Sequence, residues 1–146
     1  MQNHNSKFKI SGILKKAADF HGHLGPYLVL GLRMGNLAMA NLKCKKYFGI
    51  RAEVEGALQK PKSCLVDGIQ VTTGCTYGKG NIQKKSGCRI RAAFYNLENN
   101  KKIKIFLKKG LIKKLDNLKG RRDSELFALK LFTSDPRGIF EIRFGE

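Results

Sequence analysis

Residues 26–42 read PYLVLGLRMGNLAMANL. Pro26 suits the first turn of a helix, where a missing backbone N–H leaves no intrahelical hydrogen bond unmade. Apolar side chains fill most of the positions that follow, yet Gly31 and Gly35 stand among them. Each glycine destabilises a lone helix by up to about 1 kcal/mol, so the pair indicates that another backbone packs closely against this one. We expect residues 26–42 to form the central, buried helix of the protein.

Helical and strand patterns follow one another on both sides of this helix. Strands are expected where apolar and polar residues alternate, and helices where apolar residues recur every three or four positions. The expected helices are 11–20, 63–71, 111–118 and 125–132, and the expected strands are 51–58, 88–96, 101–109 and 139–144. The sequence therefore predicts an α+β fold, in which a mixed or antiparallel sheet packs on the central glycine-containing helix.

The length of the chain bounds its organisation. It has 146 residues, the usual size of one domain, and shows neither an internal repeat nor a linker. Residues 1–10 are polar and are expected to be disordered or frayed, and residues 11–146 are expected to form a single domain. There is no apolar run of about 18 residues and no signal-peptide pattern, so we expect a cytoplasmic protein without membrane contact.

The charge is strongly positive. The chain carries 29 Lys and Arg against 11 Asp and Glu, a formal net charge of +18. Such a surplus suits nucleic acid or an acidic partner protein. The lysines are spread along the chain in pairs rather than gathered in one block, so a basic surface without a dedicated partner is the alternative interpretation.

Two of the three histidines stand one residue apart, in the segment His21-Gly22-His23. A backbone bend at Gly22 would let both rings converge on one ion, and neutral imidazole is a common metal ligand. The alternative is a pair of polar turn residues before the central helix. We predict that His21 and His23 are metal ligands.

The segment CLVDGIQ, residues 64–70, contains one thiol and one carboxylate. If this segment is helical, Cys64 and Asp67 lie one turn apart on the same face. A cysteine at a helix N-terminus has a lowered pKa, which favours thiolate for ligation or attack. We predict that Cys64 is a metal ligand and that Cys64 and Asp67 are catalytic; the alternative is a core cysteine and a solvated aspartate.

The segment TGCTYGKGN, residues 73–81, combines three glycines with polar side chains. Glycines permit close backbone approach, and backbone N–H groups with an ammonium suit an anion. It is not a Walker A loop, because GxxxxGK[ST] is absent. We predict that Cys75, Thr76, Lys79 and Asn81 bind a cofactor or a small anionic ligand; an ordinary surface loop is the alternative.

The two blocks FHGHLGPYLVLGLRMG and CLVDGIQVTTGCTYGKGN together resemble the FmdE family, which is related to formylmethanofuran dehydrogenase. Members of this family show an HGH corner and a later C-x-x-D-x-I-Q-x-x-T-G-C-T-x-G-K-G-N block. The resemblance covers roughly residues 11–145. Two departures stand out: Tyr27 replaces a frequent glycine, and Leu24-Gly25 replaces a common pair that contains cysteine.

The resemblance implies an α+β core, often a dimer, in which the two blocks meet in one cleft. The family takes its name from association with a molybdenum or tungsten dehydrogenase that handles one-carbon units. Many relatives also carry a C-terminal zinc finger with CxxC pairs. The four cysteines here form no such pair, so any metal is expected in the core motifs.

Three hypotheses follow. The first is a metal-binding domain, accessory to or enzymatic in such one-carbon metabolism, that holds a divalent transition metal such as zinc through His21, His23 and Cys64. Asp67 would orient a ligand or move a proton. The second is a metal-free basic module that recognises nucleic acid or an acidic partner protein, and the third is thiol chemistry without metal.

Overall fold

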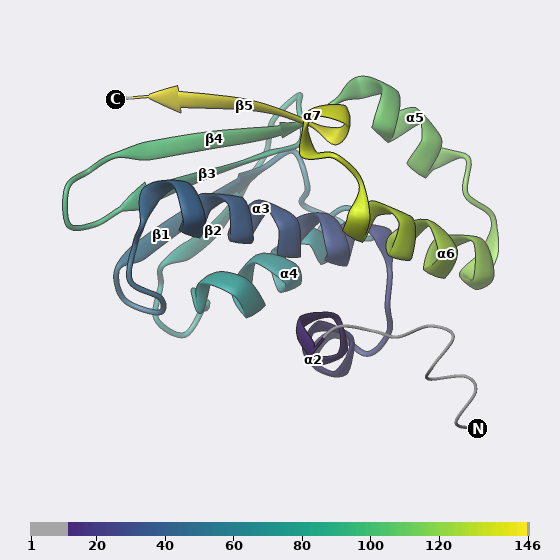
Figure 1. Cartoon of the computed structure of the whole chain (residues 1–146), viewed down its shortest axis with the longest axis horizontal. Helices are drawn as coiled ribbons and strands as arrows, with labels where there is room; N and C mark the ends of the chain where they lie inside the picture. The colour runs from purple at the N-terminus through teal and green to yellow at the C-terminus, as the bar shows by residue number, and fades with distance from the viewer. Residues whose placement is uncertain (1–11, 146) are drawn as a thin grey trace.

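The computed structural model describes residues 12–145; the segment expected to be frayed, residues 1–10, lies outside the described residues. Figure 1 shows a sheet with helices packed against it. The helices are α2 (Gly12–His21), α3 (Pro26–Leu42), α4 (Cys64–Thr73), α5 (Lys109–Asp116), α6 (Gly120–Thr133) and α7 (Pro136–Ile139). The strands are β1 (Ile50–Glu55), β2 (Ile82–Lys85), β3 (Arg91–Asn96), β4 (Lys102–Leu107) and β5 (Phe140–Gly145). The predicted α+β class is confirmed.

The sheet is mixed. Its strand order is β2-β1-β3-β4-β5, with β1 and β2 parallel and every other pair antiparallel. The strands expected at residues 88–96 and 101–109 are present as β3 and β4, which pair as an antiparallel hairpin with Phe94 opposite Ile103. Strand β2 is not predicted by the sequence pattern; it has four residues, of which only Ile82 is buried. So short a segment carries almost no periodic signal.

Helix α3 is the centre of the fold, as its sequence predicts. In Figure 1 it lies in front of the sheet, with α4 beside it. A Cβ atom at Gly31 would lie 1.9 Å from the carbonyl oxygen of Leu65, and one at Gly68 would lie 2.2 Å from that of Leu28. The two helices therefore approach backbone to backbone, and glycine is the residue that permits this contact.

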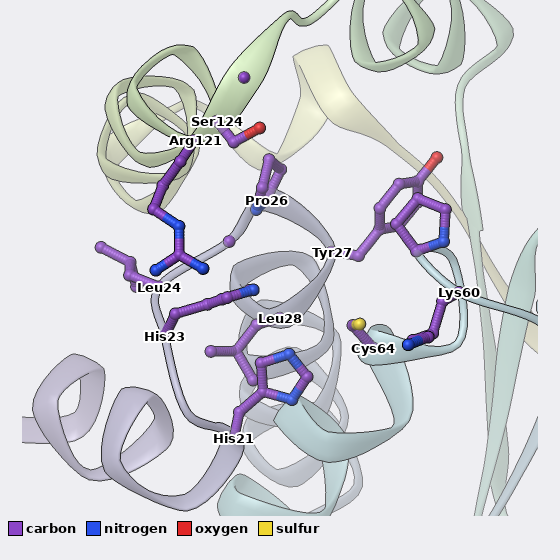
Figure 2. Close-up of a pocket in the computed structure, with 13 residues that line it drawn as sticks. His21, His23, Leu24, Pro26, Tyr27, Leu28, Lys60, Cys64, Arg121 and Ser124 are labelled. Carbon is purple, nitrogen blue, oxygen red and sulfur yellow. The ribbon is translucent and has the colours of Figure 1, made fainter.

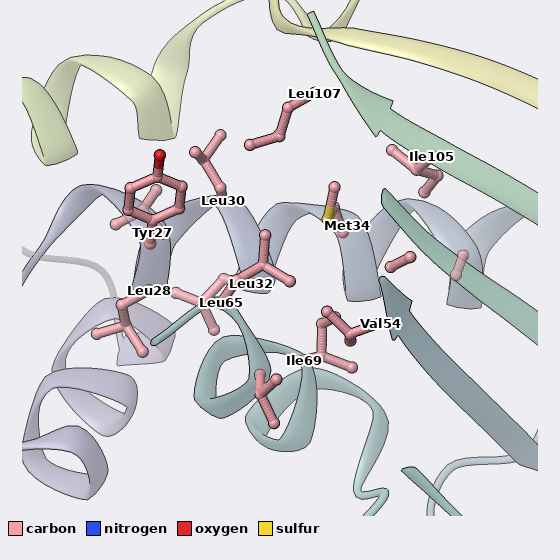
Figure 3. Close-up of a cluster of buried hydrophobic side chains, with 14 of the residues drawn as sticks. Tyr27, Leu28, Leu30, Leu32, Met34, Val54, Leu65, Ile69, Ile105 and Leu107 are labelled. Atoms are coloured by element: carbon pink, nitrogen blue, oxygen red, sulfur yellow. The ribbon is translucent and has the colours of Figure 1, made fainter. Parts of the chain in front are cut away.

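The hydrophobic core lies between these helices and the sheet. Figure 3 shows Leu30 and Met34 of α3 directed toward Ile105 and Leu107 of β4. All four side chains are at most 1% exposed. The core fixes the N-terminal ends of α3 and α4, and it is beside these ends that the histidine corner sits.

Several helix boundaries differ from the prediction. Helix α2 extends through His21, so the first histidine is helical and only His23 belongs to the turn. Helix α6 begins at Gly120 rather than at residue 125. The sequence pattern predicts no helix at residues 136–139, where the structure has the short helix α7, capped by the Asp135 side chain. Within residues 12–145 no helix is both long and apolar enough to cross a membrane.

Candidate functional site

A pocket of about 320 Å³ opens beside the N-terminal ends of α3 and α4. His21, His23 and Cys64 all line this cavity, which we call the histidine pocket. Figure 2 shows their side chains directed into the pocket from the end of α2, from the following turn and from the start of α4. Two short blocks that are far apart in the sequence thus face one space.

His21 is held by an acid from the other block. Its Nδ1–H donates to Oδ2 of Asp67 over 2.6 Å, and the two side chains are 13% and 34% exposed. This hydrogen bond fixes the orientation of the ring and leaves Nε2 as the nitrogen with a free lone pair. A carboxylate behind a histidine is the usual support of metal-ligating imidazoles.

His23 faces the first ring from the turn. The two imidazole centroids lie 5.1 Å apart, and the rings meet edge to face at 77°. Desolvation lowers the pKa of His23, the charge of Arg121 and the electrostatic effect of the neighbouring His21 lower it further, and Glu125 opposes them. His23 is therefore biased toward its neutral form, which has a lone pair for a ligand.

The pKa of the Cys64 thiol is shifted in the direction opposite to the expected one. Burial raises its pKa, the nearby carboxylate of Asp67 raises it further, and Lys60 partly opposes both. The lowered pKa predicted from the helix N-terminus was wrong, because desolvation outweighs the effect of the helix end. The residue at the N-cap of this helix, Ser63, forms no capping hydrogen bond with its side chain. A free nucleophilic thiolate at Cys64 is therefore disfavoured.

The donor types suit a transition metal, since two imidazoles and a thiol face one pocket. As the side chains stand, no group of three or more His, Cys, Asp or Glu residues that could hold a metal ion occurs among residues 12–145. A metal would need side-chain rotation to gather all three donors.

The pocket also contains residues that no sequence motif predicts. Lys60 and Arg121 line it, and no carboxylate of residues 12–145 does. Tyr27 contributes its ring, and its hydroxyl group is buried. These residues come from the loop before α4, from the start of α6 and from α3. The basic composition was the one sequence signal for them, and it does not distinguish them from the other lysines and arginines.

The glycine-rich segment 73–81 serves a different part of the molecule. Cys75 is fully buried, and its thiol donates to the carbonyl oxygen of Ile50 over 3.5 Å. The Asn81 side chain accepts from the backbone N–H of Thr76 and donates to the carbonyl oxygen of Tyr47. In this structure Cys75 and Asn81 stabilise the loop and its neighbours.

Thr76 and Lys79 line a second hollow, which shares no residue with the histidine pocket. The Lys79 ammonium donates to the carbonyl oxygen of Gly74 over 2.5 Å and to the Thr76 hydroxyl over 3.2 Å. The second motif block is thus divided: Cys64 and Asp67 belong with the histidines, whereas its glycine-rich end borders another surface.

Comparison with known proteins identifies the family. The family described as "FmdE, Molybdenum formylmethanofuran dehydrogenase operon" matches residues 20–132, which include the histidine corner, the pocket and the glycine-rich loop. The chain belongs to the FmdE family. The resemblance seen in the sequence is thereby confirmed, as is the relation of this FmdE domain to formylmethanofuran dehydrogenase.

Two individual proteins are similar to this FmdE domain. A crystal structure of a tungsten formylmethanofuran dehydrogenase FmdE-like protein from Syntrophus aciditrophicus aligns with a TM-score of 0.66 and 23% identity, over 91% of this chain and 70% of that one. A protein of Archaeoglobus fulgidus named "Probable S-adenosyl-L-methionine-binding protein" is 37% identical over 79 residues. That match spans 53% of this chain and 22% of the archaeal protein. The similarity to the Syntrophus aciditrophicus structure, at 23% identity, supports the fold alone.

Proposed function

We propose that this FmdE domain binds a divalent transition metal, zinc by its donor set, in the histidine pocket. It would act as an accessory or enzymatic domain in one-carbon metabolism of the formylmethanofuran dehydrogenase type. The observation that carries the proposal is the His21–Asp67 hydrogen bond in a pocket also lined by His23 and Cys64. Asp67 orients one imidazole, and the depressed pKa of His23 keeps the other neutral.

Each residue has a defined part in this proposal. His21, His23 and Cys64 would hold the metal, which when bound would supply Lewis acidity to a ligand in the pocket. Asp67 keeps a proton on Nδ1 of His21 and so directs Nε2 to the metal. A metal would also reverse the raised pKa of Cys64, because a coordinating thiol is deprotonated.

The other ligand of the pocket is proposed to be a small anion. Lys60 and Arg121 line the pocket, and the side chain of neither forms a hydrogen bond or ion pair with another of the described residues. Two free cations without a facing carboxylate favour a carboxylate or phosphate over a sulfonium cation. We therefore do not extend S-adenosyl-L-methionine binding from the archaeal relative to this pocket.

Metal analysis tests the proposal directly. Untagged protein, purified without metal affinity steps, should contain zinc or another divalent transition metal by mass spectrometry. After chelation, titration against a chromophoric competitor should recover the site, with affinity lowered roughly tenfold or more by His23→Ala or Cys64→Ala. Cys88→Ala, at an exposed cysteine outside the pocket, is the matched control.

The opposite result would be absence of metal together with equal affinities for all four proteins. That outcome would reject the metal site and favour the metal-free binding module. We also propose, from the family resemblance, that the domain forms a homodimer in the cytoplasm; light scattering on the purified chain measures its mass.

A further inference from the structure

The second hollow, formed by residues outside the histidine pocket, is basic. It measures about 320 Å³ and is bordered by α2, by the turn at residues 43–49, by the end of α4 and by the glycine-rich loop. Lys16, Lys46 and Lys79 line it, and no Asp or Glu of the described part of the chain does. The nearest acid on α2, Asp19, is paired with Lys15 at 3.2 Å. The hollow therefore presents an uncompensated positive charge.

Exposed aromatic side chains line the same hollow or adjoin residues that line it. Phe20 and Tyr47 line it at 58% and 53% exposure. Phe48, 78% exposed, follows Tyr47, and Tyr77, 52% exposed, lies in the loop between Thr76 and Lys79. Phe144 is the remaining strongly exposed aromatic residue of the described chain, so exposure of aromatic rings is concentrated here rather than scattered.

The cations and the rings are interleaved. The Lys46 ammonium lies 5.1 Å from the centroid of Tyr47, and the Lys79 ammonium lies 5.4 Å from that of Phe48. Such pairs place a positive charge at the edge of each flat apolar surface. A ligand that alternates planar rings with negative charges would match both.

The backbone holds Tyr47 in place. Its φ of +76° lies in the left-handed region that L residues rarely adopt. The backbone N–H of Tyr47 donates to the carbonyl oxygen of Thr73, and the Asn81 side chain donates to the carbonyl oxygen of Tyr47. A Cβ at Gly74 would lie 2.4 Å from the tyrosine ring. The glycine-rich loop thus fixes the position of a half-exposed aromatic side chain, which is an unusual arrangement for a solvated turn.

We propose that this basic aromatic hollow binds single-stranded nucleic acid. Bases would stack on Phe20, Tyr47 and Phe48, and phosphates would pair with the lysines. The site is independent of the proposed metal, because the two hollows share no lining residue. It gives the family's glycine-rich block a role in this chain that the histidine pocket does not provide.

Single strands fit the observations better than the other polyanions. A duplex hides the faces of its bases inside the stack, so it could use the lysines but not the exposed rings. An acidic peptide would likewise pair with the lysines and would leave the flat aromatic surfaces without a specific partner. Stacking is the interaction that uses every feature of the hollow.

Fluorescence anisotropy with a labelled oligo(dT) or oligo(U) of about 12 nucleotides, within the usual site size, tests this inference. Three phosphate contacts predict a slope of log K against log salt of about −2. A duplex of equal length and poly-L-glutamate should bind more weakly at the same salt. Equal or tighter binding of either one would overturn the proposal, and tighter poly-L-glutamate would identify an acidic partner instead.

Variants separate stacking from charge. Phe20→Leu and Phe48→Leu should each weaken binding roughly fivefold or more with an unchanged salt slope. Lys46→Gln should reduce the slope by about 0.7. The controls Phe144→Leu, on the edge strand β5, and Lys113→Gln, on α5, should change neither quantity. Loss of affinity in the controls as well, or in none of the variants, would reject the site.

Two further measurements complete the design. Thermal unfolding by circular dichroism shows that each variant is folded. Nucleic-acid binding by the His23→Ala protein and by chelator-treated wild type should equal that of the untreated wild type. That comparison distinguishes failure of this site from failure of the metal site, and a parallel loss of both would contradict two independent surfaces.

Discussion

Nδ1 of His21 and Oδ2 of Asp67 lie 2.6 Å apart, although 46 positions separate the two residues in the chain. His21 is the last residue of α2, and Asp67 is in the first turn of α4. Their contact is therefore a tertiary one, made by the packing of α2 against α4. It joins the two motif blocks and sets the direction of the His21 ring in the pocket.

Asp67→Asn tests this relationship. Asparagine keeps the size of the side chain but loses the charge that favours a proton on Nδ1 of His21. We expect the affinity for zinc to fall by roughly 10- to 100-fold, as for other residues that orient a metal ligand, while the melting temperature changes little. Competition with a chromophoric chelator measures the affinity for zinc. Asp123→Asn, an exposed acid on α6, should leave the affinity unchanged, and equal affinities for both variants would exclude a positioning role for Asp67.

The charge around His23 predicts a second effect. Arg121 lowers the pKa of this histidine and Glu125 raises it. Arg121→Gln should therefore move the pKa up toward its ordinary value of 6.5, and Glu125→Gln should move it down. Proton NMR of the imidazole Cε1–H over a pH series gives both values. Shifts in the opposite directions would show that neither side chain acts on His23 through its charge.

The same pKa fixes the sign of a pH dependence. The folded protein binds a proton at His23 less readily than the unfolded chain does, so the stabilising contribution is present above pH 6.5 and is lost as the pH falls below it. Metal affinity should fall in the same range, because a protonated imidazole has no lone pair to donate. A metal titration that is flat from pH 7.5 to about 5.5 would contradict a histidine ligand.

The close contact of α3 and α4 predicts an effect on stability. Gly31→Ala places a methyl group 1.9 Å from the carbonyl oxygen of Leu65, so the backbone of one helix must shift. Overpacking should lower the free energy of unfolding by about 2 kcal/mol or more, despite the higher helix propensity of alanine. Urea denaturation measures the change. Gly110→Ala, where a Cβ would meet nothing within 4 Å, should have almost no effect; equal effects would refute the close approach.

Local sequence signals account for much of the fold. Pro26 predicts the start of α3. The following glycines predict a closely packed partner, because glycine destabilises a helix interior unless close packing of a second backbone compensates for it. The hairpin of β3 and β4 follows from alternation and from the turn at Asn100, whose φ is +63°. The parallel strand β2 could not be predicted in this way, since its pairing with β1 depends on the tertiary path of the chain.

The candidate site likewise combines residues that a motif predicts with residues that only tertiary packing brings together. The motif residues His21, His23 and Cys64 could be selected from their spacing, whereas Lys60 and Arg121 lie in segments without any motif and reach the pocket through packing alone. The direction of the Cys64 pKa depends on burial, which the sequence does not show. The metal ligation and the anion binding predicted from these motifs stay predictions until they are measured.

The buried hydroxyl of Tyr27 predicts another effect on stability. Tyr27 stands where the family often has glycine, it is 6% exposed, and its hydroxyl has no hydrogen-bond partner among residues 12–145. A buried hydroxyl left unpaired costs about 1–3 kcal/mol. Tyr27→Phe removes that group and keeps the ring, so we expect the free energy of unfolding at pH 7 to rise by about 1 kcal/mol in urea denaturation. A loss of stability would mean that the hydroxyl has a partner when the protein is in solution.

Alkaline pH provides an independent check on the same side chain. Burial, followed by the charge of Asp116, raises the pKa of Tyr27 to about 12. The unfolded chain loses this proton near pH 10 while the folded protein retains it, so stability falls as the pH rises from 10 toward 12. The fall attributable to Tyr27 is on the order of 2 kcal/mol, and Tyr27→Phe should lack it. Parallel stability curves for the two proteins across this range would show that Tyr27 titrates as an ordinary exposed tyrosine.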